Sequence, residues 1–128
     1  MPGRPNALYR NAAEEFAHRV VASLGGRVDS IVLFGSVARK RATRESDIDV
    51  LVIGEKHEPQ GKVLDTAYDV WEQSDFDAFI TVVYFTREEL RELARLGSPF
   101  IANVLEEGII LYDTGIFAVL RKRLPASF

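Results

Sequence analysis

Short apolar runs of strand length alternate along this chain with longer stretches of helical periodicity, and this alternation constrains the fold most strongly. Residues 28–34 contain the apolar run Ile31-Val32-Leu33-Phe34, which is short enough for a buried strand. Residues 48–53 and 78–85 predict two further strands, the second rich in Ile, Val, Tyr and Phe. We therefore expect an α/β fold, with a small mixed β-sheet and flanking helices.

Helical spacing and capping residues predict the segments between these strands. Asn6 is expected to cap the first helix, and Trp71 to pack into the core. Thr86 and Glu89 have the spacing of a capping box, and Ser98-Pro99 is typical of a helix start. The expected helices cover residues 6–24, 60–72, 86–97, 98–108 and 116–124, with a last short strand at 109–112.

The bulk composition is that of an ordinary globular protein. The 128 residues, 47% of them hydrophobic and 27% charged, fit a single domain spanning 1–128. No apolar run approaches the roughly 20 residues that span a bilayer, so no membrane association is expected. The absence of cysteine excludes disulfides and zinc-thiolate sites and fits a cytoplasmic protein. A net charge of −3 makes a nucleic-acid partner unlikely for the chain as a whole.

Two carboxylates open the second predicted strand. Because residues two apart on a strand point the same way, Asp47 and Asp49 share one face, while Ile48 can pack inward. Two adjacent carboxylates repel each other unless a cation lies between them. Mg²⁺ binds one or two carboxylates together with phosphate oxygens and water, so the pair suits Mg²⁺ and a nucleoside triphosphate.

The Gly35-Ser36 pair follows the first predicted strand and turns into a short helix. Glycine lets the backbone approach a ligand closely, and the amides of a helix N-terminus favour phosphate. Ser36 can cap the helix, bind a phosphate oxygen, or do both, and Arg39 lies one turn on, on the same side. A basic cluster adjoins the carboxylates and favours an anion site: Arg39, Lys40, Arg41 and Arg44.

One pattern in this sequence resembles the signature of the DNA polymerase beta nucleotidyltransferase superfamily. It consists of Gly35-Ser36, a spacer of ten residues, and Asp47-x-Asp49. The short length and the segments 98–101 and 107–109 resemble the minimal nucleotidyltransferases of prokaryotes. The resemblance implies the nucleotidyltransferase fold. It also implies Gly35 and Ser36 at the nucleotide phosphates, with Asp47 and Asp49 as catalytic metal ligands.

This sequence departs from the family pattern at two positions. Lys40 stands where the family usually has a glycine that ends the short helix, which predicts a longer helical turn or a strained residue. The superfamily also has a third carboxylate on a later strand, and Asp77 has the strand parity to be this catalytic residue and metal ligand. Two other interpretations stay open. Asp77 can be a solvent-facing residue at the start of the strand, or the position of the third carboxylate, counted back from Thr86, can fall at Thr81.

The resemblance implies an enzyme that transfers AMP from ATP to a hydroxyl acceptor. Minimal nucleotidyltransferases are commonly paired with a small helical HEPN protein as antitoxin and toxin. The acceptor would then be a tyrosine of the HEPN toxin, and this chain would be the antitoxin. Two alternatives are a non-catalytic nucleotide-binding antitoxin that masks its partner, and a nucleotidyltransferase acting on a small molecule such as an antibiotic. In a small-molecule nucleotidyltransferase, a homo-oligomer could form the cleft that binds the acceptor.

Overall fold

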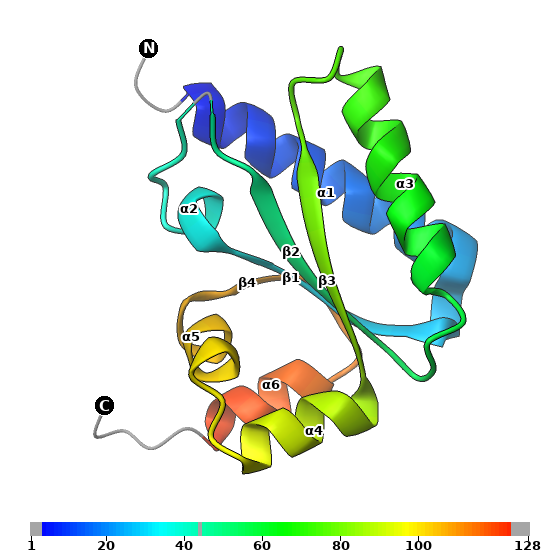
Figure 1. The fold of residues 1–128 in the computed structure, drawn as a ribbon, viewed down its shortest axis with the longest axis vertical. Helices are drawn as coiled ribbons and strands as arrows, with labels where there is room; N and C mark the ends of the chain where they lie inside the picture. The colour runs from blue at the N-terminus through cyan, green and yellow to red at the C-terminus, as the bar shows by residue number, and fades with distance from the viewer. Residues whose placement is uncertain (1–3, 44, 124–128) are drawn as a thin grey trace.

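The computed structural model describes residues 4–43 and 45–123 and contains helices on both faces of a four-stranded sheet (Figure 1). The strands are β1 (Val28–Phe34), β2 (Ile48–Gly54), β3 (Ile80–Thr86) and β4 (Ile109–Asp113). The α-helices are α1 (Arg4–Leu24), α2 (Gly35–Ala38), α3 (Gln60–Gln73), α4 (Arg87–Arg95), α5 (Pro99–Glu107) and α6 (Ile116–Lys122). A 3₁₀ turn, Gly25–Arg27, joins α1 to β1. Among the described residues, no helix is long and apolar enough to cross a membrane.

The sheet is mixed, with the strand order β3-β2-β1-β4. β1 runs antiparallel to both β2 and β4, whereas β2 and β3 are parallel and are joined through α3. This topology confirms the expected α/β fold with a small mixed sheet. It also makes β3 an edge strand and puts the start of β2 beside the end of β1.

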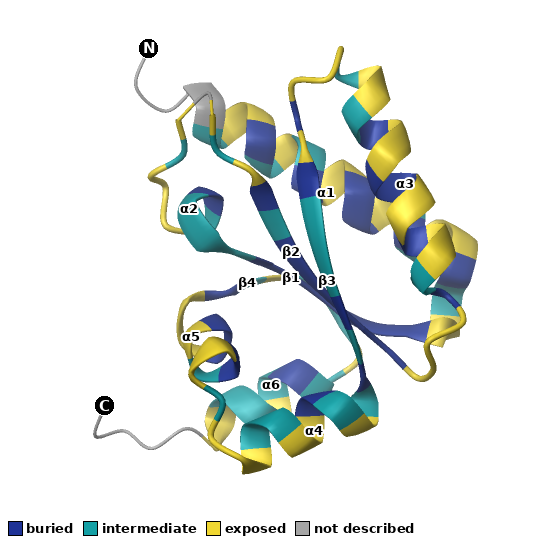
Figure 2. Ribbon diagram, viewed as in Figure 1, coloured by how far each residue is buried: buried dark blue, intermediate teal, exposed yellow. Residues whose placement is uncertain are grey.

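Two hydrophobic clusters pack against the two faces of the sheet (Figure 2). On one face, α1 and α3 cover the β2 residues Ile48, Val50 and Val52. On the other face, α4, α5 and α6 cover Leu51 and Ile53. The alternation along β2 therefore places Asp49 on the same face as Leu51 and Ile53, beyond the end of their cluster.

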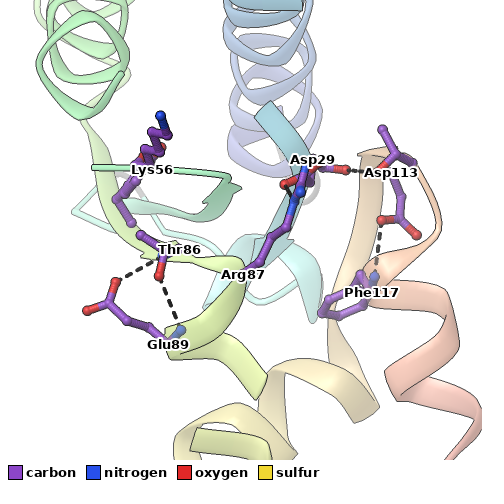
Figure 3. A network of polar contacts seen from close by, with 9 residues as sticks. Asp29, Lys56, Thr86, Arg87, Glu89, Asp113 and Phe117 are labelled. Carbon is purple, nitrogen blue, oxygen red and sulfur yellow. Dashed lines mark hydrogen bonds and ion pairs between the residues drawn. The ribbon is translucent and has the colours of Figure 1, made fainter. Parts of the chain in front are cut away.

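Most of the predicted element boundaries are confirmed to within two residues, and the predicted caps of α4 and α5 are present. The Thr86 hydroxyl accepts a hydrogen bond from the Glu89 amide, and the Glu89 carboxylate accepts one from the Thr86 amide (Figure 3). The Ser98 hydroxyl accepts a hydrogen bond from the Ile101 amide at the start of α5. These local hydrogen bonds satisfy amides that the first helical turn leaves without partners.

At α1, β3 and α6 the structure shifts the predicted boundaries by two residues. α1 begins at Arg4, so Asn6 lies inside the helix and does not cap it. β3 begins at Ile80 rather than Ala78, because a turn with positive φ at Asp75 and Phe76 precedes it. The helix predicted to extend to residue 124 ends at Lys122.

A polar network holds the end of the sheet that lies away from the start of β2 (Figure 3). The guanidinium of Arg87, the first residue of α4, donates two hydrogen bonds to the carboxylate of Asp29, at 2.5 and 2.9 Å. The Asp29 side chain is buried, so Arg87 supplies the charge that compensates it. At the start of α6, the Asp113 carboxylate accepts hydrogen bonds from the amides of Phe117 and Ala118.

Candidate active site

Asp47 and Asp49 lie at the start of β2, where the strand leaves the basic loop. Asp47 is exposed just before the strand, and Asp49 is the second strand residue and half-buried. Asp49 pairs with Phe34, the last residue of β1, in the antiparallel ladder. The end of β1 and the start of β2 therefore bring the Gly35 turn beside the carboxylates.

Gly35 is in direct contact with Asp49. Its φ is 75°, a left-handed conformation that glycine adopts readily and L residues adopt only at a cost. A Cβ added to Gly35 would lie 3.1 Å from the Asp49 Cγ and 3.3 Å from its Cβ, and would overlap Oδ2. Only glycine fits this turn without moving the Asp49 carboxylate.

The electrostatics of Asp49 indicate an uncompensated pair of carboxylates. Burial raises the pKa of Asp49 above its ordinary value, and the nearby Asp47 raises the pKa further. Arg39 acts in the opposite direction and lowers that pKa, but the net shift is upward. A cation bound between the two carboxylates would relieve the repulsion, and the all-oxygen donor set suits Mg²⁺.

Arg39 lies directly after α2 and is held by a residue far away in the sequence. Its guanidinium forms an ion pair of 3.3 Å with Glu107, the last residue of α5. Both side chains are partly exposed, so the pair contributes little to stability and mainly orients Arg39 beside Asp49. Glu107 was not identified as a site residue from the sequence, because nothing local links it to Arg39.

Ser36 is the second residue of α2, and the structure corrects one of its expected roles. The N-cap of α2 is Phe34, and no side chain caps this helix. Within the described residues, the Ser36 hydroxyl forms no hydrogen bond, so it does not serve as a cap. Its backbone carbonyl accepts a hydrogen bond from the Arg41 amide at 2.8 Å, which folds the basic loop back onto α2.

The basic loop is fastened to α1 as well. The side-chain oxygen Oδ1 of Asn6 accepts a hydrogen bond from the Ala42 backbone amide at 3.0 Å, a function that helix-capping rules do not reveal. Lys40 stands where the family usually has glycine, and its φ is 59°. Of the two expectations for this position, the strained residue is therefore correct and the longer helical turn is wrong. Arg44, predicted as part of the cluster, lies outside the described residues.

The third carboxylate is not brought to the pair in this structure. Asp77 lies three residues before β3 in an exposed turn. Thr81 is the β3 residue in register with Asp49, as counting back from Thr86 predicts. Among residues 4–43 and 45–123, no group of three or more His, Cys, Asp or Glu side chains is arranged to hold a metal ion.

This geometry defines a class of protein: an α/β domain that presents a strand-borne pair of carboxylates beside a glycine turn and a cationic side chain. A family model described as nucleotidyltransferase domain matches residues 14–111. The chain belongs to this nucleotidyltransferase family, which confirms the expected fold and enzyme class.

Individual proteins and solved structures agree with this assignment. A candidate protein adenylyltransferase of Methanocaldococcus jannaschii is 32% identical over 101 residues, which are 79% of this chain and 95% of the relative. A chain of a toxin–antitoxin complex with AMP-PNP superposes with a TM-score of 0.57 at 22% identity, covering 85% of this chain and 83% of that one. A chain of the complex of tri-AMPylated Shewanella oneidensis HEPN toxin with MNT antitoxin gives a TM-score of 0.52 at 19% identity, covering 88% and 83%. At these identities the structures establish a shared fold.

Proposed function

We propose that this protein transfers AMP from Mg²⁺-bound ATP to a hydroxyl group of a protein partner. The observation that carries the proposal is the contact between the Gly35 turn and Asp49, beside Asp47. It supports a site where a glycine backbone, two carboxylates and Arg39 lie together at the start of β2. Such a set of groups suits a triphosphate and its metal ion.

Each residue has a role in this proposal. Asp47 and Asp49 hold Mg²⁺, which when bound neutralises charge on the phosphates. The Gly35 turn and Ser36 bind phosphate oxygens, and Arg39 binds the triphosphate with its guanidinium held by Glu107. The acceptor oxygen bonds to the α-phosphorus, the bond from that phosphorus to pyrophosphate breaks, and the acceptor proton passes to solvent.

The proposed acceptor is a tyrosine of a HEPN-type helical partner, with this chain as the antitoxin. The relative described as a candidate protein adenylyltransferase supports a protein acceptor. The shared fold with antitoxins crystallised with HEPN toxins supports the kind of partner.

A second candidate function is masking of the partner without transfer. Thr81 in register with Asp49 favours it, because a hydroxyl supplies no negative charge for a second metal ion. Asp77 stays a predicted third ligand that would have to approach the pair from its turn. Substitutions at these two positions separate the alternatives.

The decisive experiment is co-expression with the HEPN-type partner, followed by intact-mass measurement of the partner. We expect a gain of one or more AMP groups with the wild type and none with Asp47→Asn or Asp49→Asn. Asp77→Asn should abolish transfer only if Asp77 is a ligand, whereas Thr81→Asp should raise the rate if the pair lacks its third carboxylate. Neutralisation by the wild type without any mass gain, retained in Asp47→Asn, would establish masking instead.

Arg39→Ala gives an independent check of the triphosphate site. Binding of ATP should weaken more than binding of adenosine, because Arg39 acts on the phosphates. Calorimetric titrations of both ligands measure this, and equal losses for the two would show that the substitution disturbs the fold instead.

A further inference from the structure

An exposed apolar surface lies along the outer side of α3 and the edge of β3, outside the proposed active site. Leu64, Tyr68 and Trp71 recur at helical spacing on α3, and Phe76 and Phe79 follow in the turn before β3. Leu64, Tyr68, Phe76 and Phe79 are each between 45% and 55% exposed. We call these five residues the α3 edge surface, and Figure 2 shows how much of α3 faces solvent.

Four of the five residues of the α3 edge surface form one connected cluster of rings. The Trp71 ring meets those of Tyr68, Phe76 and Phe79 edge to face, at centroid distances of 5.7, 4.9 and 5.1 Å. Such packing holds the rings rigid, so little side-chain entropy remains to be lost on binding. Clustered Trp, Tyr and Phe side chains are typical of the centre of a protein interface.

The turn that presents Phe76 is held in a costly conformation. Asp75 and Phe76 are consecutive non-glycine residues with φ of 56° and 61°. The left-handed conformation is unfavourable for each of them, because their Cβ atoms crowd the backbone. The contact between the Phe76 and Trp71 rings helps to offset this cost, and it leaves Phe76 half exposed.

Carboxylates flank the α3 edge surface. Between residues 60 and 80 the chain carries one basic residue, Lys62, and five acidic residues. The five acidic residues are all exposed: Asp65, Asp69, Glu72, Asp75 and Asp77. No ion pair within residues 4–43 and 45–123 involves them. Three of them, on α3, run parallel to the apolar stripe at the same helical spacing. The surface therefore repels nucleic acid and complements a basic partner.

The α3 edge surface also reaches the proposed active site. The Phe79 carbonyl accepts a hydrogen bond of 2.9 Å from the Ile48 amide, and Ile48 lies between Asp47 and Asp49. A partner that covers Phe79 therefore lies beside the β2 backbone between the two carboxylates. Its acceptor has to reach around the β3 edge, because Asp49 faces the side of the sheet opposite α3.

We propose that the α3 edge surface docks the protein acceptor, through a helical segment of the partner with an apolar face flanked by Lys or Arg. The inference rests on the proposed function, because docking here would bring an acceptor hydroxyl to Asp47 and Asp49. The acidic flank selects the partner by charge, and the ring cluster supplies the apolar contact.

The test uses two synthetic amphipathic helices of about 18 residues with the same Leu and Phe face. One carries lysines beside that face and the other carries glutamates. Trp71 is the only tryptophan of the chain, so its fluorescence reports binding at this surface directly. The lysine helix should shift the Trp71 emission and saturate, with an affinity that falls as salt is added, and the glutamate helix should not bind.

Variants locate the binding. Truncating aromatic hot spots at an interface weakens binding strongly, so Tyr68→Ser with Phe76→Ser should raise the Kd of the lysine helix at least about tenfold. Asp65→Asn with Asp69→Asn and Glu72→Gln should also raise this Kd and flatten its salt dependence. Leu8→Ser, at 48% exposure on α1, is the matched control and should leave the Kd unchanged. Mg²⁺-ATP binding should match the wild type in every variant, which shows that each variant is folded at the temperature of the assay.

Four outcomes overturn the inference: binding of neither helix, equal binding of both helices, an unchanged Kd in the Tyr68→Ser, Phe76→Ser variant, or a dimer in sedimentation that this variant dissolves. The last would assign the surface to a second copy of the chain. Asp47→Asn should bind the lysine helix like the wild type. If the wild type binds the lysine helix but transfers no AMP to the partner, the proposed function is refuted and the docking surface stands.

Discussion

Replacing Gly35 by alanine tests whether the turn after β1 and the Asp47–Asp49 pair form one unit. The φ of 75° imposes a cost of about 1–2 kcal/mol on any L residue. The added Cβ also overlaps the Asp49 carboxylate, and such overpacking costs about 1–3 kcal/mol. We therefore expect Gly35→Ala to lower the free energy of unfolding by about 2–5 kcal/mol and to displace the Asp49 carboxylate.

Gly97→Ala is the matched control for the backbone cost. Gly97 has a φ of 74°, and nothing lies within 4 Å of the Cβ that alanine would add. This variant should lose only about 1–2 kcal/mol and bind Mg²⁺-ATP like the wild type. Adding Asp49→Ala to Gly35→Ala should recover part of the lost stability, because it removes the carboxylate that the new Cβ meets.

Urea unfolding measures the stabilities, and calorimetric titration with Mg²⁺-ATP measures the affinities. The affinity of Gly35→Ala should fall at least about tenfold, equivalent to 1.4 kcal/mol, since Asp49 no longer holds its position. The reasoning is refuted if both alanine variants lose the same stability and Gly35→Ala still binds Mg²⁺-ATP like the wild type.

Three further predictions concern the groups around this turn. Asp49→Asn should raise the melting temperature of the ligand-free protein at neutral pH. Burial and Asp47 raise the pKa of Asp49, so stability is lost as pH rises from the ordinary pKa of 3.8 through the raised pKa. If the melting temperature of Asp49→Asn exceeds that of the wild type by the same amount below pH 3.8, this explanation is contradicted. Lys40→Gly should stabilise the protein by about 1 kcal/mol, because a residue with a φ of 59° is relieved of strain, and a lower urea midpoint would argue against it. Asn6→Ala should cost about 1 kcal/mol and speed hydrogen exchange of the loop amide that Asn6 holds, whereas unchanged exchange would show that the loop is fastened elsewhere.

Local chemistry was sufficient to predict most of the elements. The apolar run that ends at Phe34 predicts β1, and the Thr86–Glu89 capping box predicts the start of α4, because each signal lies within a few residues of the structure that it causes. The spacing of Asp47 and Asp49 likewise predicts their common face. The side chains that could not be predicted are those whose partners are distant in the sequence.

Asn6 and Glu107 illustrate this limit. Asn6 has the residue type of a helix cap, but its oxygen binds an amide 36 positions away. Glu107 meets Arg39 over a separation of 68 residues. The sequence predicts Trp71 in the core, but Trp71 is only partly buried and joins an exposed ring cluster. The turn that brings Phe76 to it has positive φ at Asp75 and Phe76, and no glycine marks this turn in the sequence.

The pairing of Phe34 with Asp49 has a consequence for how the protein folds. Gly35 and Asp49 are 14 residues apart, so closing the loop between them costs little chain entropy, and their contact forms together with the β1–β2 hairpin. The ion pair of Arg39 with Glu107 closes a loop of 68 residues and requires α5 to have docked. We therefore expect the carboxylate pair and its turn to form early in folding. We expect Arg39 to reach its final orientation last, when the C-terminal half packs against the sheet.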